Sequence, residues 1–214
     1  LRCPISAPFV KRWSREPKMP MRVIAGSAKG RRLKLVPGDS TRPILDRVKE
    51  ALFNLIGHEI VGAAFLDLFS GTGSVAIEAL SRGAAHATLI DTDGMAIRTI
   101  HENLALTKLA DNAAVLRADA LKLLRQPPRR QYQFIYVAPP QYKGLWKQVL
   151  QVLDENPAWL GPDTVVIVQI DPKEQEALSL RHLSSYDERR YGKTLLWFFE
   201  TRDSSADEER PLQE

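Results

Sequence analysis

Residues 65–73 read Phe-Leu-Asp-Leu-Phe-Ser-Gly-Thr-Gly, a short apolar run that ends in a glycine-rich turn. The run has the length of a buried strand, and a helical pattern from Ser74 to Arg82 follows it directly. In an open α/β sheet, ligands bind beyond the carboxyl ends of the strands, and the first strand-turn-helix unit usually lies there. Gly71 and Gly73 would let the backbone approach a nucleoside closely, because no side chain intervenes. The stretch therefore predicts an α/β fold with a nucleoside site at the edge of its sheet.

Outward from this turn, short strand-like stretches alternate with helical patterns. The strand-like stretches are 63–69, 87–92, 113–119, 132–140 and 164–170, and the helical patterns are 74–82, 94–109, a short one after Asp119, and 144–153. Such alternation with right-handed crossovers predicts a doubly wound, mostly parallel sheet with helices on both faces. The last two stretches, 182–191 and 193–200, leave no room for a helix between them, so we expect an antiparallel hairpin there.

A basic N-terminal part precedes the alternation. From residue 21 the pattern predicts two short strands around a turn at 26–30, then a helix through about His58 that Asp46 or Thr41 would cap. The expected organisation is a disordered extension at 1–20, a basic hairpin and helix at 21–60, the α/β domain at 61–201, and an acidic disordered tail at 202–214.

Composition narrows the class of protein. The 214 residues are 44% hydrophobic and 26% charged, and no apolar run approaches the roughly 18 residues of a membrane span. The single cysteine, Cys3, cannot form an internal disulfide, and the four scattered histidines lack metal-ligand spacing. We therefore expect a soluble protein without a metal, located in the cytoplasm. A chloroplast is the alternative location if residues 1–20 are the remnant of a transit peptide.

Positive charge is concentrated near the N-terminal end. Residues 1–50 hold 13 Lys and Arg against 4 Asp and Glu, while the other residues hold 17 against 22. Such a cluster indicates a polyanionic partner such as RNA. A solvated, solubilising face is the alternative, since no aromatic signature of RNA reading accompanies the charge. The candidate RNA-binding residues are Arg22, Lys29, Arg31, Arg32, Lys34, Arg42 and Arg47, with Lys49 beside them.

The glycine turn allows two kinds of nucleoside ligand. Its glycines and Ala76 match the dinucleotide pattern G-x-G-x-x-G/A, and Asp91, 20 residues after Gly71, is placed to accept hydrogen bonds from a ribose. Asp67 favours S-adenosylmethionine, because a carboxylate there would attract its cationic end and repel a pyrophosphate. A nicotinamide enzyme is thus a weaker alternative, and a structural turn without any ligand is the remaining one.

The fourth expected strand ends in the sequence Ala-Pro-Pro-Gln-Tyr at 138–142. Two consecutive prolines end the strand ladder and stiffen the chain, and the carbonyls there are free to accept from a ligand amine. A plain strand-terminating turn is the alternative. An aromatic side chain at 142 would stack on an unpaired base or serve ordinary packing. The candidate catalytic residues are Ala138, Pro139, Pro140 and Tyr142, whereas Trp146, Trp159 and Trp197 are expected in the core.

Taken together, these motifs resemble the RsmD family of rRNA (guanine-N2)-methyltransferases. The resemblance covers about 21–200 and rests on MRVIAGSAKGRRLKLVPG (21–38), TRPILDRVKEALFNLIG (41–57), FLDLFSGTGSVAIEALSRGA (65–84) and LIDTD (89–93). It implies a Rossmann-like methyltransferase fold that binds S-adenosylmethionine. The implied cofactor-binding residues are Asp67, Gly71 and Gly73 at its methionine end, Asp91 at its ribose and Asp119 at its adenine, together with Phe69. Taken alone, Asp119 is more often a helix cap than a ligand.

The resemblance also implies the reaction and the partner. The methyl group would pass to N2 of a guanine in small-subunit 16S rRNA, with the small-subunit rRNA or a pre-assembled small ribosomal subunit as substrate and the enzyme acting as a monomer. Segment 42–54 would help to order the active site, and the basic hairpin would hold RNA. A methyltransferase acting on adenine N6 of RNA or DNA, or a non-catalytic RNA-binding assembly factor, remains as an alternative.

One position departs from the family pattern. Families that methylate exocyclic amines usually carry Asp, Asn or Ser before the two prolines, and this chain carries Ala138. The amine of guanine is a poor nucleophile because its lone pair is delocalised into the ring, so a side-chain acceptor normally helps to localise it. Alignment of the amine with the methyl sulfonium can itself lower the barrier by several kcal/mol. We therefore expect an active but slower enzyme, or one in which another acceptor substitutes.

Overall fold

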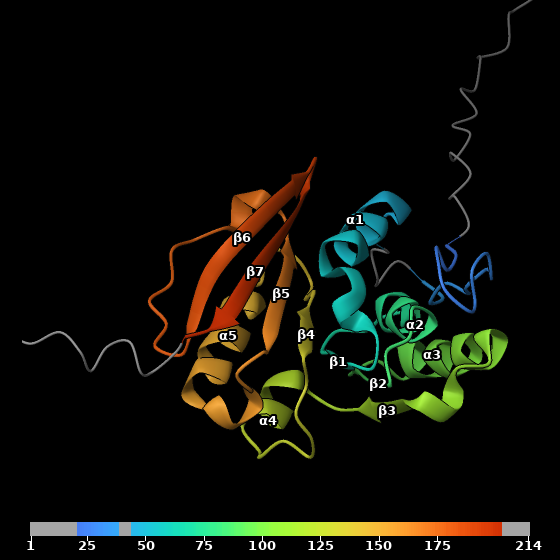
Figure 1. The fold of residues 1–214 in the computed structure, drawn as a ribbon, viewed down its shortest axis with the longest axis horizontal. Coiled ribbons are helices and arrows are strands. Elements are labelled where there is room, and N and C mark those ends of the chain that lie inside the picture. The colour runs from blue at the N-terminus through green and yellow to red at the C-terminus, as the bar shows by residue number, and fades with distance from the viewer. Residues whose placement is uncertain (1–20, 39–43, 203–214) are drawn as a thin grey trace, which may run out of the picture.

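The structure, a computed structural model, describes residues 21–38 and 44–202. Its strands are β1 (Ala64–Asp67), β2 (His86–Asp91), β3 (Ala113–Arg117), β4 (Phe134–Val137), β5 (Val165–Ile170), β6 (Leu183–Tyr191) and β7 (Thr194–Thr201). They form one sheet in the order β3-β2-β1-β4-β5-β7-β6 (Figure 1). The first five strands are parallel, and β6 and β7 form an antiparallel hairpin that pairs with β5 through β7. The expected doubly wound, Rossmann-like sheet is confirmed.

Helices cover both faces of this sheet. The α-helices are α1 (Asp46–Ile56), α2 (Ser74–Ser81), α3 (Gly94–Thr107), α4 (Ala120–Leu124) and α5 (Leu145–Glu155). Short 3-10 turns lie at Gly57–Ile60, Ala110–Asn112, Pro157–Trp159 and Pro172–Glu174. Neighbouring strand residues point to opposite faces, so Phe65 packs with α1, α2 and α3 while Leu66 packs with α4 and α5. Trp146, Trp159 and Trp197 are buried in the second cluster, as expected.

Residues 21–38, here called the docked segment, lie against α2 and α3 at one end of the molecule (Figure 1). The hairpin expected there is present but too short for two regular strands: an antiparallel bridge joins Arg22 to Arg32, and the N–H groups of Val23 and Leu33 donate to the Arg31 and Met21 carbonyls over 3.0 and 2.8 Å. The pairing ends after Val23, because the next backbone donors of the segment bind α2 instead of the opposite arm. The N–H groups of Ile24 and Ala25 donate to the Glu78 carboxylate over 2.7 and 2.9 Å. The segment also contributes to the same hydrophobic core as the sheet.

The start of α1 also differs from expectation. Its N-cap is Leu45, and no side chain of the described residues caps the helix, so Asp46 is the first helical residue; Thr41 lies outside the described residues. The Asp46 carboxylate instead accepts a hydrogen bond of 3.2 Å from Arg22 Nε. Lys49, expected on the basic face, is fully buried, because its Nζ donates to the Arg22 carbonyl over 2.6 Å and lies 3.4 Å from Glu78 Oε2.

Gly26 sets how closely the docked segment approaches α2. Its φ is +80°, and a Cβ built there would lie 1.7 Å from the Ser81 carbonyl oxygen, which accepts a hydrogen bond from Ser27. We expect Gly26→Ala to destabilise the protein by about 3 kcal/mol in urea denaturation, since strain and a backbone clash add.

Gly30→Ala is the matched control, because Gly30 has the same φ of +80° but no heavy atom within 4 Å of the added Cβ. It should cost only about 1 kcal/mol, the conformational part alone. Equal losses at the two glycines would show that the contact between Gly26 and Ser81 contributes nothing.

Candidate functional site

A cavity of about 620 Å³ opens at the carboxyl ends of the parallel strands. It lies where the strand order reverses between β1 and β4, which is where open α/β sheets bind ligands. Its volume falls within the range of about 300–1,000 Å³ that is typical of small-molecule sites. Most of the residues expected to bind or act on ligands line this single cavity: Asp67, Phe69, Gly71, Asp91, Asp119, Ala138, Pro139 and Pro140.

Hydrogen bonds to β2 fix the turn that follows β1. Ser70 exchanges bonds with Ile90, since its N–H donates to the Ile90 carbonyl and its Oγ accepts from the Ile90 N–H, both over 2.9 Å. The Gly71 N–H donates to Asp91 Oδ2 over 2.8 Å, and Asp93 N–H donates to Asp91 Oδ1 over 2.9 Å. A carboxylate has about four acceptor positions, so Asp91 retains capacity for ribose hydroxyls.

The two glycines of the turn have different tasks. Gly71, with φ of 52°, lines the cavity. Gly73 is not among the lining residues, which corrects the expectation that its backbone approaches the ligand. A Cβ at Gly73 would lie 3.0 Å from the Leu89 side chain and 3.3 Å from Ile100, at a φ of +77°. Gly73 therefore permits close packing of α2 against β2 and α3.

Asp67 is the most unusual charged group in the cavity. Its side chain is 1% exposed, and within the described part of the chain its Oδ1 has no hydrogen-bond partner. Burial raises the pKa of Asp67 to about 7, although a hydrogen bond from the Phe69 backbone favours the charged form. A buried carboxylate oxygen that is left without a partner is costly. The unpaired oxygen therefore fits the cationic end of S-adenosylmethionine.

Asp119 both caps a helix and lines the cavity. Its Oδ1 accepts from the Lys122 N–H over 2.9 Å at the start of α4, which satisfies the cap alternative. Beside it, the side chains of Ala118, Ala120 and Leu121 form an apolar wall. An apolar wall next to a carboxylate suits an adenine ring, whose faces are apolar and whose amine can donate a hydrogen bond.

The residues after β4 divide between the cavity and the surface. Ala138, Pro139 and Pro140 line the cavity, but Tyr142 does not. The Tyr142 hydroxyl donates to Asp171 Oδ2 over 2.8 Å, and its side chain is 65% exposed. Tyr142 thus lies on the surface between two lining residues, Gln141 and Lys143, and its stacking on a target base stays a prediction.

Sequence reasoning missed two polar side chains of the cavity. Tyr136 on β4 and Gln169 on β5 both line it, and the Tyr136 hydroxyl donates to Gln169 Oε1 over 2.6 Å. Each is hidden in an apolar strand pattern that indicates only burial. The available signal was the polar Gln169 near the end of the run Thr-Val-Val-Ile-Val-Gln-Ile, at the edge where ligands bind.

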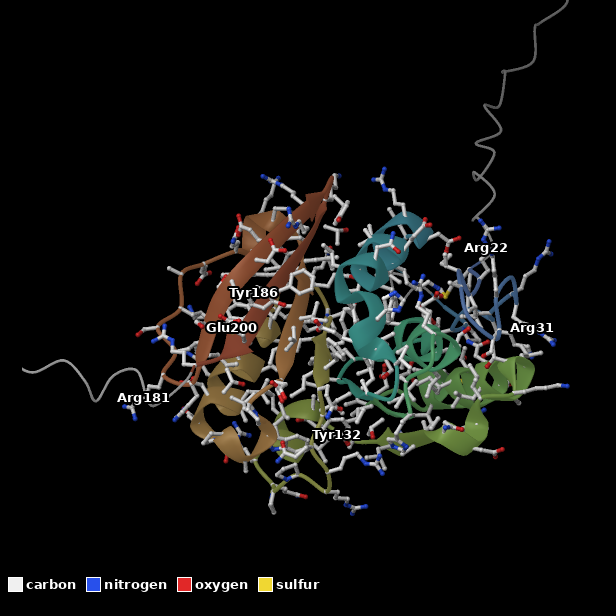
Figure 2. All side chains as sticks on the ribbon, viewed as in Figure 1. Arg22, Arg31, Tyr132, Arg181, Tyr186 and Glu200 are labelled. Carbon is white, nitrogen blue, oxygen red and sulfur yellow. The ribbon has the colours of Figure 1, made fainter. Side chains whose placement is uncertain are left out.

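Six of the candidate RNA-binding side chains lie in the described residues and are exposed, and they come from two different parts of the fold. Five belong to the docked segment: Arg22, Lys29, Arg31, Arg32 and Lys34. Figure 2 shows Arg22 and Arg31 at the outer edge of that segment. Arg47 lies elsewhere, on α1, where its guanidinium would be 3.6 Å from a Cβ at Gly192 in the turn between β6 and β7. Arg42 lies outside the described residues.

Residues 21–38 and 44–202 contain no group of three or more His, Cys, Asp or Glu side chains arranged to hold a metal ion. None of the helices in these two ranges is long and apolar enough to cross a membrane.

The sheet order, the glycine turn tied to a ribose-type aspartate, and the buried carboxylate facing the cavity define the class. Together they are the features of a Rossmann-like methyltransferase that uses S-adenosylmethionine.

Comparisons with known proteins give the family. Residues 21–200 match the family model described as "Conserved hypothetical protein 95". The chain is 39% identical over 184 residues to a putative rRNA methyltransferase, YlbH, of Bacillus subtilis, covering 85% of this chain and 100% of the relative. It is 38% identical over 149 residues to ribosomal RNA small subunit methyltransferase D of Escherichia coli K12, covering 70% of this chain and 74% of the relative.

A solved structure agrees with these matches. The putative methyltransferase yhhF from Escherichia coli superposes with a TM-score of 0.75 at 33% identity, covering 86% of this chain and 99% of that one. The chain therefore belongs to the RsmD family of S-adenosylmethionine-dependent rRNA methyltransferases.

Proposed function

We propose that this protein transfers the methyl group of S-adenosylmethionine to N2 of a guanine in small-subunit rRNA, acting as a monomer on an assembled small subunit. The observation that carries the proposal is the buried Asp67 oxygen, which has no partner among residues 21–38 and 44–202, in a cavity that also holds the Ala138-Pro139-Pro140 wall. Relatives whose names specify small-subunit rRNA support the choice of substrate.

The cavity residues assign a task to each part of the site. Asp67 would bind the cationic end of the cofactor, Asp91 its ribose hydroxyls and Asp119 its adenine. When bound, S-adenosylmethionine supplies a methyl group already activated on a sulfonium, so no covalent bond to the protein is needed. Pro139 and Pro140 form a rigid wall that would orient the target base and exclude water.

The methylated product identifies the reaction. Small subunits that lack the modification are incubated with the protein and labelled S-adenosylmethionine, and nucleosides from the rRNA are analysed by mass spectrometry. N2-methylguanosine is the expected product. N6-methyladenosine in place of N2-methylguanosine would show that the protein methylates adenine and not guanine. Cofactor binding in calorimetry without any transfer to subunits would instead favour a non-catalytic assembly factor.

The docked segment should supply part of the RNA affinity. Replacing Arg31 and Arg32 together by Ala should weaken binding to small subunits and reduce the slope of log K against log salt by about 2, one per phosphate contact. Arg129 and Arg130 are the matched control, since this exposed pair precedes β4, at the opposite edge of the sheet from the cavity. Equal effects of the two double substitutions, measured by filter binding at several salt concentrations, would rule out a specific role for the docked segment.

A further inference from the structure

Gln169 lies beside Ala138 across two neighbouring strands. The parallel register of β4 and β5 pairs Tyr136 with Ile167 and Val137 with Val168. One further step along both strands brings position 138 next to position 169. Since side chains alternate between faces, Ala138 and Gln169 share the face on which Tyr136 and Ile167 are buried. Both residues line the cavity. The side chain of Gln169 is therefore adjacent to Ala138, whose methyl group offers no hydrogen-bond acceptor.

Tyr136 orients the amide of Gln169. The phenol hydroxyl donates to Gln169 Oε1 over 2.6 Å. Burial, with a smaller contribution from the charge of Asp67, raises the pKa of Tyr136 well above its usual range, so the hydroxyl keeps its proton and remains a donor. The Tyr136 ring is held among core aromatic residues, with its centroid 6.3 Å from that of Phe65. Because an amide oxygen has two lone pairs, Gln169 Oε1 keeps one for a second donor.

We propose that Gln169 accepts a hydrogen bond from the exocyclic amine of the target base, in place of the side-chain acceptor that Ala138 lacks. The inference rests on the proposed function, because it concerns the amine that this function methylates. The small side chain of Ala138 leaves the space beside the prolines to the Gln169 amide. Tyr136 is a positioning residue, since it acts through Gln169.

The hydrogen bond would act on the nucleophile. N2 of guanine carries two hydrogens, and Gln169 Oε1 would accept one of them, which directs the nitrogen lone pair out of conjugation with the ring and toward the methyl group. The bond from N2 to the methyl carbon forms as the bond from that carbon to sulfur breaks, and the electron pair of the broken bond stays on sulfur. N2 then gives up one proton to solvent water as the methylated base leaves the site, so that a neutral secondary amine remains.

Gln169→Met tests the proposal, because methionine has nearly the shape of glutamine but accepts only weakly. We expect kcat for methylation of small subunits to fall about 100-fold, as when one positioned hydrogen-bonding group is removed from an active site. The Kd for S-adenosylmethionine in calorimetry should change less than twofold. Gln148→Met, an exposed residue on α5, is the matched control and should leave kcat unchanged.

Three further variants separate an acceptor role from a structural one. Gln169→Glu keeps an acceptor and should retain more activity than Gln169→Met. Adding Ala138→Asn to Gln169→Met should restore at least tenfold of the lost kcat, because it returns an acceptor on the neighbouring strand. Tyr136→Phe should lower kcat about tenfold, as expected for loss of a group that orients a ligand-binding side chain.

Two kinds of failure are distinguishable. If the wild-type protein produces N2-methylguanosine and Gln169→Met does so at the same kcat, the role of Gln169 is wrong and the proposed function stands. A parallel loss of cofactor affinity and kcat in Gln169→Met, without rescue by Ala138→Asn, would likewise overturn the acceptor role. If the wild-type protein methylates no guanine, the proposed function itself fails.

Discussion

Replacing Asp67 by Asn should weaken the binding of S-adenosylmethionine about 100-fold, a loss of about 2.7 kcal/mol. The carboxylate is 1% exposed and its Oδ1 has no partner among the described residues, so a bound cation is its counter-charge in a region from which water is excluded. Asn has the same shape but no charge. Isothermal calorimetry at pH 8 measures the change. Asp111→Asn, on an exposed 3-10 turn far from the cavity lining, should leave the affinity unchanged.

The same carboxylate should make cofactor binding depend on pH. Because the pKa of Asp67 is raised to about 7 and only the ionised form attracts a cation, the affinity of the wild-type protein should rise about tenfold from pH 6 to pH 8. The contribution of Asp67 to this rise should disappear in Asp67→Asn. A wild-type affinity as flat with pH as that of the Asn variant would contradict the assignment of Asp67.

Stability of the unliganded protein should change in the opposite direction. Between pH 3.8 and about 7 the folded protein keeps the Asp67 proton while the unfolded chain loses it, so the free energy of unfolding falls as pH rises through this window. Above pH 7 the loss approaches about 4 kcal/mol, the equivalent of about three pKa units. Asp67→Asn should therefore be more stable than wild type at pH 8 but not at pH 4, and cofactor should stabilise only the wild type strongly.

Glu78→Gln should destabilise the protein by about 3–5 kcal/mol, the cost of leaving a buried charge without its partner. Glu78 is fully buried and accepts from the N–H groups of Ile24 and Ala25, from Arg82 Nε over 2.9 Å, and lies 3.4 Å from Lys49 Nζ. Lys49 is itself fully buried. Burial lowers the pKa of Lys49, and the nearby charge of Glu78 opposes this shift. Removal of the Glu78 charge would therefore leave a poorly compensated ammonium.

A double substitution separates the charge from the packing. Lys49→Met in the Glu78→Gln background should recover about half of the lost stability in urea denaturation, because the unpaired charge disappears with its partner. Additive losses from the two substitutions would show that Glu78 and Lys49 do not interact in the folded protein. The docked segment is also connected to the glycine turn of the cavity. Asn103 exchanges hydrogen bonds with the backbone of Lys34 in the docked segment and donates to the Thr72 carbonyl in the turn.

Local sequence patterns predicted which of the candidate cofactor-binding residues would meet in the folded chain. They placed Gly71 in the turn after the first strand of the sheet and Asp67, Asp91 and Asp119 at the ends of successive strands, and these four residues line one cavity. The prediction succeeded because the carboxyl ends of parallel strands meet at one edge of a sheet whatever their separation along the chain. It was wrong at Gly73, where a pattern of glycines does not distinguish ligand approach from helix packing.

Within the α/β domain the sequence alone determined which segments are strands and helices, because the length of an apolar run and the helical period are properties of each short stretch. It also determined the antiparallel end of the sheet, since too few residues join its last two strands to cross over. Only the tertiary structure decided that Lys49 is buried against Glu78 and that Gln169 lies beside Ala138. Both depend on pairing between segments about 30 residues apart, and no local pattern encodes which side chain of one element will face which side chain of another.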